Sequence, residues 1–369
     1  MNSQSSVRAS SDKKSIFTPP QRLLIVRLGA MGDIIHTLPA VAALRSAFPQ
    51  TIFGWIVEER WADLLSVTVQ QGGFSPHQLV DRVHTVNTKQ WRKAMLASQT
   101  WNEIVSSVRD FRAPRYEVAV DFQGAIRSSF LSRWSGAPRI YGFAHPRESP
   151  ARILYTDVVE ASGAHIIEQN ISLAQAVAGR ALTIPEVEFP TNSRAQEQLD
   201  LLLRKKNIDR FILLTPGAGW GAKQWPPERY AEVATALAED GFVSVINFGP
   251  SEESLARAVE SASGGDATAV TTSILELIAL TRRASLFIGG DTGPLHLAAA
   301  LHIPVAAIFG PTNPARNGPF GTASIVLRSP SSVTDHTRHA ETEAGLLEIT
   351  AQQVVTAARQ LLKIGASSQ

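Results

Sequence analysis

The chain has 369 residues, of which 44% are hydrophobic and 18% are charged. This composition is typical of a globular protein and excludes wholesale disorder, and the length predicts two domains. Cysteine is absent, which excludes disulfides, thiolate nucleophiles and thiolate metal sites. A reducing compartment such as the cytoplasm is compatible with this composition.

Charge is distributed unevenly along the chain. The net charge is only +2, yet residues 89–152 contain eleven Lys or Arg against five Asp or Glu. Residues 1–21 are polar and contain no apolar run, so we expect a disordered tail there rather than a signal peptide or anchor. No apolar window is long enough to span a bilayer.

The first half of the chain alternates apolar runs with segments of helical periodicity. We expect strands at 23–26, 52–57, 82–86, 118–121 and 139–141, and helices at 34–48, 91–109, 125–134 and 168–182. Alternation of this kind predicts a parallel sheet covered on both faces. These residues, 22–182, make the expected first domain.

Prolines in the segment 183–192 indicate a domain boundary, after which the alternation starts again. We expect strands at 211–215, 242–248, 286–289 and 305–309, and helices at 226–239, 252–262, 273–283 and 294–301. The second expected domain is therefore 183–349. Residues 350–369 contain a final helix, which we expect to pack back on the first domain.

The first candidate functional group follows the first strand, because ligands of open α/β sheets bind beyond the carboxyl ends of the strands. The segment Gly29-Ala30-Met31-Gly32-Asp33 is similar to a dinucleotide fingerprint but lacks its third glycine. Asp33 would repel a pyrophosphate at this helix N-terminus. It is a candidate general base, and an ordinary helix cap is an equally good interpretation.

The second candidate lies in the second domain, where Asp291-Thr292-Gly293-Pro294 opens a helix directly after a strand. Proline suits the first helical turn, and the free N–H groups and dipole of the helix N-terminus can bind a diphosphate. Asp291 or Thr292 can also cap the helix with no ligand present.

Neighbouring residues suit the same anion. His296 lies one turn into that helix and can donate to phosphate, although a helix histidine is often structural. A glycine-rich turn containing Gly219 leads to Lys223, which supplies positive charge. Glu252 follows another strand and either accepts from ribose hydroxyls or caps its helix.

Metal-binding motifs are missing from the sequence. Neither Asp-x-Asp nor His-Glu-x-x-His occurs, so we expect no dedicated metal site and no cofactor. Lysine, histidine and the helix dipole would then have to neutralise a leaving diphosphate.

Two segments together, residues 24–40 (LIVRLGAMGDIIHTLPA) and 290–300 (GDTGPLHLAAA), resemble the two signatures of glycosyltransferase family 9. The similarity is greatest to the heptosyltransferase I group of lipopolysaccharide synthesis. Further matching segments lie at 55–59, 91–93, 121–124, 141–142, 147–148 and 223–226. The resemblance covers about residues 22–330.

The resemblance implies a GT-B fold of two Rossmann-like domains facing across a cleft, and an inverting, metal-independent reaction. It implies an ADP-heptose donor in the second domain and a Kdo-lipid A acceptor in the first. The enzyme would work as a monomer at the cytoplasmic face of the inner membrane. Asp33 would deprotonate the acceptor hydroxyl. The donor would be bound by Gly219, Lys223, Glu252, Thr272, Asp291, Thr292, Gly293 and His296.

The basic stretch suits an acceptor that carries carboxylates and phosphates, which arginine binds bidentately. We expect acceptor contacts from Lys89, Arg92, Lys93, Arg127 and Arg147. An ordinary solvated surface is the alternative interpretation of these residues.

Two departures from the family pattern affect the donor site. Ala218-Gly219 stands where the pattern has two threonines, so phosphate contacts there would come from the backbone, and Thr272 stands where it has methionine near the adenine. A relative with another donor or acceptor, such as heptosyltransferase II, is therefore the first alternative. An NAD-dependent oxidoreductase is the distant one.

Overall fold

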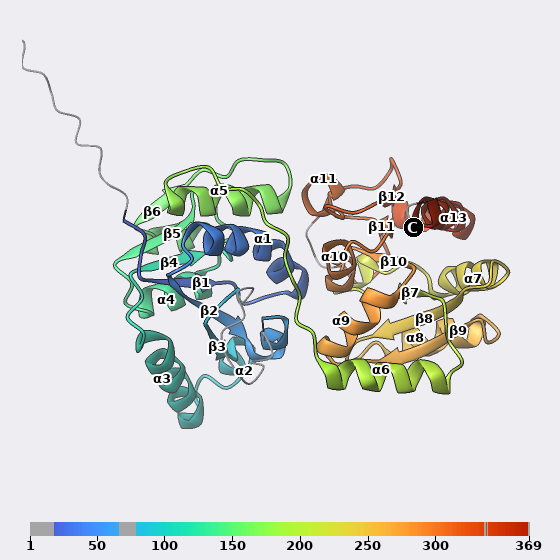
Figure 1. Ribbon diagram of the computed structural model, residues 1–369, viewed down its shortest axis with the longest axis horizontal. Helices are drawn as coiled ribbons and strands as arrows, with labels where there is room; N and C mark the ends of the chain where they lie inside the picture. Colours follow the sequence, from blue (N-terminus) through green and yellow to red (C-terminus); the bar gives the residue numbers. More distant parts are fainter. Residues whose placement is uncertain (1–17, 66–78, 336, 338, 368–369) are drawn as a thin grey trace, which may run out of the picture.

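The computed structural model describes residues 18–65, 79–335, 337 and 339–367. Its strands form two parallel six-stranded sheets with helices on both faces (Figure 1), which confirms the predicted α/β class. Most of the expected N-terminal tail, residues 1–17, lies outside the described residues. Among the described helices, none combines the length and apolar character needed to cross a bilayer.

The first sheet has the strand order β3-β2-β1-β4-β5-β6. Its strands are β1 (Arg22–Val26), β2 (Ile52–Glu58), β3 (Arg82–Val86), β4 (Val118–Asp121), β5 (Arg139–Phe143) and β6 (Asp157–Val159). Its helices are α1 (Met31–Ala47), α2 (Thr88–Lys93), α3 (Ser98–Arg112), α4 (Ile126–Trp134) and α5 (Ile166–Ala178), with the 3₁₀ helices η1 (Glu59–Leu64) and η2 (Ser149–Leu154). β1 is apolar throughout Leu23–Val26 because its two faces lie in two different cores.

The second sheet has the order β12-β11-β10-β7-β8-β9. Its strands are β7 (Phe211–Thr215), β8 (Val243–Phe248), β9 (Ala267–Thr271), β10 (Leu286–Gly290), β11 (Val305–Phe309) and β12 (Ser324–Arg328). Its helices are α6 (Ser193–Lys205), η3 (Gly221–Lys223), α7 (Pro227–Ala238), α8 (Glu253–Ala262), α9 (Ile274–Arg283), α10 (Gly293–Ala300), α11 (Pro314–Asn317), α12 (Ala344–Glu348) and α13 (Ala351–Ser367). The proposed boundary near residue 182 falls between α5 and α6, where the chain has neither helix nor strand.

Both sheets have the same doubly wound topology. In each, the chain starts on a central strand, builds outward on one side, and then returns to the centre to build the other side. The reversal lies between β1 and β4 in the first sheet and between β7 and β10 in the second. In such sheets a crevice forms at the reversal, beyond the carboxyl ends of the strands. The loops that matter for function are therefore those after β1, β4, β7 and β10.

Several short elements were not predicted from the sequence. β6, β9, β12 and helix α6 were missed, and the single helix expected at 91–109 is the pair α2 and α3, separated by residues 94–97. β6 has three residues and β12 is an edge strand with a mixed burial pattern, so neither has the continuous apolar run of a central strand.

The predicted position of the C-terminal helix was wrong. α13 packs against α7 and against β10, β11 and β12 of the second domain, as Figure 1 also shows. Its buried residues Val354, Val355, Ala358 and Leu361 share a core with Leu346 of α12. Only Ile349 and Thr350 separate α12 from α13. This short connection keeps α13 beside α12, so its apolar face packs on the second domain.

The two domains touch where α1 packs against α10, and also where α9 packs against η1. A Cβ atom at Gly32 would lie 2.5 Å from Cδ2 of His296, and one at Gly293 would lie 2.7 Å from Cβ of Met31. Across the same contact, Nε2 of His36 lies 3.1 Å from Nδ1 of His296. His36 is 5% exposed, and burial, together with the nearby His296, His165 and Arg27, lowers its pKa well below the usual value of 6.5.

Because the pKa of His36 is lowered in the folded protein, we predict that the protein loses stability as the pH falls. Between the folded-state pKa and 6.5, His36 binds fewer protons in the folded than in the unfolded protein, so acidification favours unfolding. The free energy of unfolding should fall below pH 6.5 with a slope of up to about 1.4 kcal/mol per pH unit from this group. Urea titrations between pH 5 and 8 measure the slope.

The variant His36→Gln should be less stable at pH 7 and should have a smaller slope. The control is His145→Gln, since this histidine is 85% exposed and should not affect the slope. If His36→Gln had the same slope as the wild type, His36 would not be the source of the pH dependence.

Candidate functional site

Asp33 lies in the first turn of α1 and faces the contact between the domains. Its Oδ2 accepts a hydrogen bond of 3.0 Å from the N–H of Ala30, the N-cap residue of α1. Its Oδ1 lies 2.8 Å from a guanidinium nitrogen of Arg27, at the end of β1, and the carboxylate remains 37% exposed. Each carboxylate oxygen has two lone-pair sites, so Asp33 can accept a further proton or hydrogen bond.

The loop after β4 holds Arg27 in place. A second guanidinium nitrogen of Arg27 donates to the carbonyl of Phe122, and Gln123 accepts a hydrogen bond of 3.0 Å from the N–H of Leu28. The loop is organised by Asp121, a fully buried carboxylate that accepts from Tyr155, Ser128 and the N–H groups of Gln123 and Gly124. Burial raises the pKa of Asp121, and these hydrogen bonds oppose the shift.

In the second domain, Asp291 lies between two cationic or donating side chains. Nζ of Lys223 is 2.5 Å from Oδ2, and Nε2 of His296 is 3.1 Å from Oδ1. Burial by itself would raise the pKa of Asp291, but His296 and Lys223 outweigh burial and hold the pKa well below its usual range. The carboxylate is therefore ionised at neutral pH.

This arrangement orients the ring of His296. A carboxylate only accepts hydrogen bonds, so Nε2–H of His296 donates to Asp291. Nδ1 of His296 lies 3.1 Å from Nε2 of His36. A side chain of the first domain therefore helps to set the orientation of a ring in the second.

The start of α10 has unused hydrogen-bond donors. Thr292 is the N-cap residue, but its side chain makes no capping bond, and Asp291 does not cap the helix either. The N–H groups of the first helical turn therefore point toward the domain contact without an intrahelical partner. Such a helix start attracts an anion.

The other predicted donor residues surround the ends of β7 and β8. Glu252 accepts a 2.8 Å hydrogen bond from the N–H of Gly249, and its carboxylate lies directly over Gly217, where a Cβ would clash. Thr272 accepts from the amide of Asn247 at 2.8 Å. No atom lies within 4 Å of a Cβ built at Gly219, so this backbone is open to approach.

The five predicted acceptor residues are exposed on loops and helices of the first domain. Lys89, Arg92 and Lys93 lie on α2, Arg127 on α4, and Arg147 after β5. Among the described residues none of them has an ion-pair partner. All five lie on segments that follow the carboxyl ends of β3, β4 and β5, at the same sheet edge as Asp33. Arg147 lies against the loop after β4, since its N would be 3.0 Å from a Cβ at Gly124.

Sequence reasoning assigned no role to Arg27, His36 or Arg316. Arg316 lies on α11, and partial desolvation lowers its pKa, while the charges of Asp33, Arg27 and Arg147 also act on it. It therefore faces the space between the domains. A strand-terminal arginine next to the glycine turn was the available signal for Arg27. No sequence signal identified the other two, because their roles depend on domain contacts.

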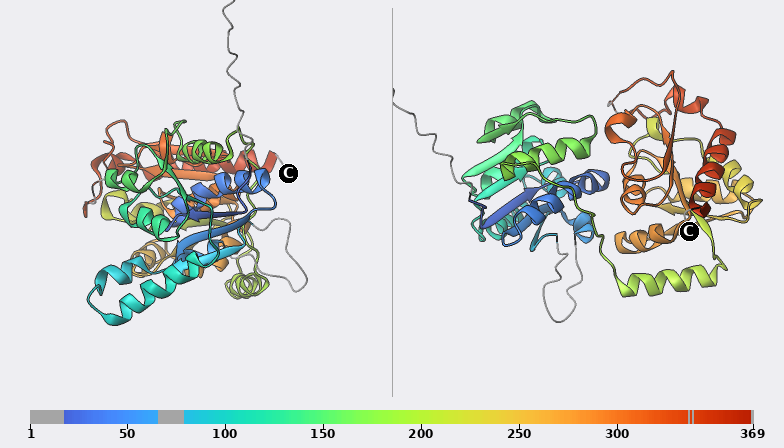
Figure 2. Two further views of the ribbon diagram at one scale, coloured as in Figure 1. Left: turned by 90° about the vertical axis from the view of Figure 1, so that its left-hand side faces the viewer. Right: turned by 45° about the horizontal axis from the view of Figure 1, so that its top comes forward.

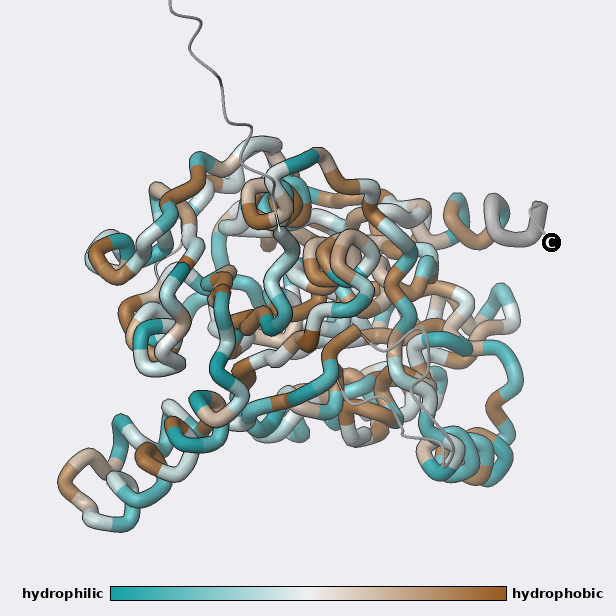
Figure 3. The backbone as a smooth tube through the Cα atoms, turned by 60° about the vertical axis from the view of Figure 1, so that its left-hand side comes forward, coloured by the Kyte–Doolittle hydropathy of each residue, from teal (hydrophilic) through white to brown (hydrophobic). Residues whose placement is uncertain are grey.

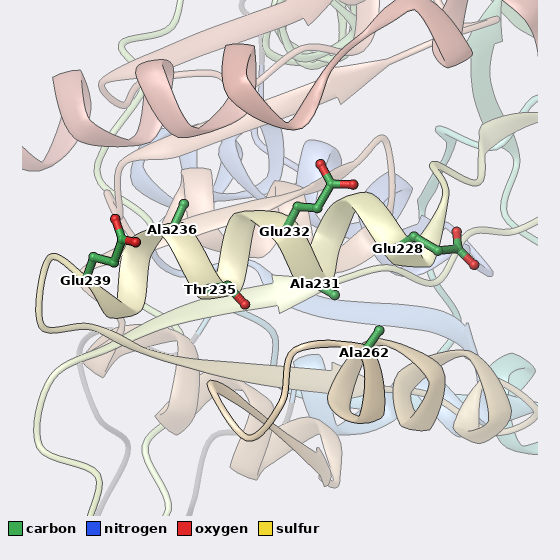
Figure 4. A pocket seen from close by; sticks show the side chains of 7 residues that line it. All are labelled: Glu228, Ala231, Glu232, Thr235, Ala236, Glu239 and Ala262. Atoms are coloured by element: carbon green, nitrogen blue, oxygen red, sulfur yellow. The ribbon is translucent and has the colours of Figure 1, made fainter.

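A separate hollow between α7 and α8 is a poor site for an anion (Figure 4). It is lined by the carboxylates of Glu228, Glu232 and Glu239 and by no basic side chain. A diphosphate would be repelled there. The candidate site is therefore the contact between α1 and α10 rather than this hollow.

Comparisons with known proteins agree with this geometry. Residues 104–347 match the sequence profile of glycosyltransferase family 9 (heptosyltransferase). Lipopolysaccharide heptosyltransferase 1 of Pseudomonas aeruginosa (strain PAO1) is 29% identical, over 84% of both chains. The Escherichia coli (strain K12) enzyme of the same name is 28% identical, over 84% of this chain and 94% of the relative.

Solved structures show the same architecture. The structure of the E. coli heptosyltransferase WaaC with ADP has a TM-score of 0.73 and 25% identity, and the match covers 93% of this chain and 99% of that one. The two Rossmann-like domains are the GT-B fold predicted from the sequence. Because the family profile matches more than half of the chain, the protein belongs to glycosyltransferase family 9.

Proposed function

We propose that this glycosyltransferase transfers heptose from ADP-heptose to Kdo of the lipopolysaccharide inner core, as a heptosyltransferase I. The observation that carries the proposal is the apposition of Asp33, at the start of α1, with the Asp291, Lys223 and His296 cluster at the start of α10. The relatives named lipopolysaccharide heptosyltransferase 1 support the choice of substrates.

The donor would bind at the start of α10. The N–H groups of its first turn, Lys223 and His296 would face the diphosphate, whose negative charge grows as the glycosidic bond breaks. Lys223 is already held by Asp291, so it would be positioned for the diphosphate before the donor arrives. The heptose hydroxyls would bind to Asp291, and the ribose to Glu252. Gly219 and Thr272 would lie beside the nucleotide, and Thr292 and Gly293 beside the phosphates.

Asp33 would act as the general base on the opposite side. It would take the proton from an acceptor hydroxyl while that oxygen bonds to the anomeric carbon of heptose, and the bond to the diphosphate breaks as ADP leaves. Attack opposite the leaving group inverts the anomeric centre. Arg27 holds the carboxylate in place, and its pairing leaves lone pairs free for the proton. No metal takes part in this mechanism.

The acceptor would bind to the first domain. Positive charge without an ion-pair partner among the described residues lies at the sheet edge that carries Asp33, on Lys89, Arg92, Lys93, Arg127 and Arg147. Kdo carboxylates and lipid A phosphates are its natural partners. We place the enzyme, as a monomer, at the cytoplasmic face of the inner membrane, where such an acceptor is embedded.

A panel of donors and acceptors tests the proposal. ADP-heptose with a Kdo-terminated acceptor should give a heptosylated product of inverted configuration, and EDTA should not reduce the rate. A preference for a heptose-terminated acceptor would indicate a heptosyltransferase II activity instead. Transfer from another nucleotide-sugar would contradict the donor assignment, and dependence on added magnesium would contradict the metal-free mechanism.

Replacing Asp33 tests its role as the base. Asp33→Asn retains an oxygen that can accept from the N–H of Ala30, so the helix start should remain folded. Because asparagine cannot take a proton, kcat should fall by roughly 10²- to 10⁴-fold, the usual contribution of general-base catalysis, with donor affinity nearly unchanged.

The matched control for this variant is Asp157→Asn, which also breaks an Asp–Arg pair in the first domain, with Arg139, far along the chain from Asp33. It should keep its turnover. If Asp33→Asn turned over at the rate of the wild type, Asp33 would be only a helix cap.

A further inference from the structure

Helix α4 exposes three of its large apolar side chains and buries three of its serines. Ile126, Phe130 and Trp134 are 39%, 43% and 42% exposed, and their spacing of four residues places them on one face of the helix. The rings of Phe130 and Trp134 lie 5.8 Å apart. The buried residues of α4 are Ser128, Ser129, Leu131 and Ser132. An amphipathic helix of a globular protein normally has the reverse arrangement.

The serines tolerate burial because each has a hydrogen-bond partner, and Ser128 donates to Asp121. Ser129 donates to the carbonyl of Ile126, and Ser132 to that of Ser128. The buried face is therefore satisfied and closely packed, which leaves the aromatic face without a partner in the described structure.

A second exposed apolar group lies on the neighbouring pair α2 and α3, which projects from the body of the molecule (Figure 2, left). At the turn between these helices, Met95 is 59% exposed and Leu96 is fully exposed, and Trp101 and Val105 of α3 are 55% and 44% exposed. Figure 3 shows hydrophobic colour at the far end of this projection. The indole N–H of Trp101 donates to the carbonyl of Met95 at 2.9 Å, so the tip is ordered.

The helices that carry the two groups are in contact. α3 contacts α4, and α4 contacts η2, where Ile153 is 84% exposed. Figure 1 shows α3 and α4 on the side of the first domain that lies away from the second domain. We call this side the α3–α4 face; its apolar members are Met95, Leu96, Trp101, Val105, Ile126, Phe130, Trp134 and Ile153.

The charge on the same elements is mainly positive. Arg133 and Arg152 are exposed on α4 and η2, and they add to Arg92, Lys93 and Arg127. A face with both aromatic side chains and basic residues does not suit a second copy of itself, because docking would bring like charges together. It suits a partner whose outer layer is anionic and whose interior, just below that layer, is apolar.

We propose that the α3–α4 face docks on the anionic surface of a lipid bilayer. Its aliphatic and aromatic side chains enter the boundary between headgroups and acyl chains, tryptophan lies at the interface, and the basic residues bind lipid phosphates. The purpose of such docking rests on the proposed function. Because α2 and α4 start at the sheet edge that carries Asp33, docking would bring the acceptor-binding side of the site to the membrane.

Sedimentation with vesicles tests the docking without donor or acceptor present. The wild type should bind vesicles containing phosphatidylglycerol more tightly than vesicles of phosphatidylcholine alone. The triple variant Leu96→Ser/Phe130→Ser/Trp134→Ser should lower the partition coefficient by at least about tenfold, because three buried apolar groups are lost. The matched control changes three apolar residues that are 45%, 66% and 70% exposed outside this face, as Ile184→Ser/Leu201→Ser/Val333→Ser, and should bind like the wild type.

The charge variant Arg133→Gln/Arg152→Gln removes two basic residues that have no assigned role in the acceptor site. It should weaken binding to phosphatidylglycerol vesicles by about fivefold per charge, with little effect on phosphatidylcholine. If the wild type failed to sediment with anionic vesicles, or the apolar triple variant bound as the wild type does, the proposal would be wrong. A wild-type dimer that the apolar variant converts to monomer would assign the face to a second copy instead.

Transfer assays separate this proposal from the proposed function. The apolar variant should be as active as the wild type on a water-soluble, deacylated acceptor and slower on an acceptor embedded in vesicles. Equal loss on both acceptors would contradict docking. If the wild type transferred no heptose, the proposed function would be wrong. Docking would still be decided by the sedimentation experiment, which needs no transfer activity.

Discussion

The site depends on how closely the starts of α1 and α10 approach each other. Two glycines, Gly32 and Gly293, permit the approach, because any side chain at these positions would collide with His296 or with Met31 across the contact. The same contact places the only catalytic carboxylate that we assign, Asp33, opposite the helix start that we assign to the donor. The two sheets have the same strand topology, and in each the loops at the reversal of strand order lie at this contact.

Buried polar groups maintain the geometry on both sides. Lys223 and Asp291 form a pair whose side chains are 10% and 7% exposed. Removing one partner from such a pair leaves an uncompensated buried charge and costs about 3–5 kcal/mol, so each partner requires the other. In the first domain, Asp121 has an equivalent role: it orders the loop that holds Arg27, and Arg27 in turn holds Asp33. In our account the Asp121 network touches no substrate and acts only through Arg27 and Asp33. Lys223 and Asp291, by contrast, hold each other in the positions from which they would contact the donor.

The sequence predicted the fold better than it predicted the contacts. Central strands such as β7 and β11 were found to the residue because they are continuous apolar runs between turns, and Asp33 was found because it follows such a strand. The pairing of Lys223 with Asp291 was not predicted, since 68 residues separate them and only the fold brings them together. The position of α13 was wrong for a related reason: periodicity identifies an apolar face but not the surface that covers it.

Helix α4 shows the same limit more sharply. Ile126, Phe130 and Trp134 recur at helical spacing, which normally indicates the face turned to the core, and here they form a face turned to solvent, while Leu131 is buried. Only the burial of its serines reveals the inversion. The basic residues of the first domain could be predicted from the sequence. The apolar surface beside them could not, because the exposure of an apolar side chain depends on which side of its helix packs on the sheet.

The close approach of α1 and α10 is tested most directly by the turnover number of Gly32→Ala. His296 cannot move aside easily, since Asp291 and His36 hold both of its ring nitrogens. The added methyl group should therefore separate the base from the donor. A displacement of about 1 Å can lower kcat by roughly a hundredfold, and we expect a loss of that order with the donor dissociation constant and thermal midpoint nearly unchanged. Wild-type turnover in folded Gly32→Ala would contradict the claim that catalysis requires this apposition.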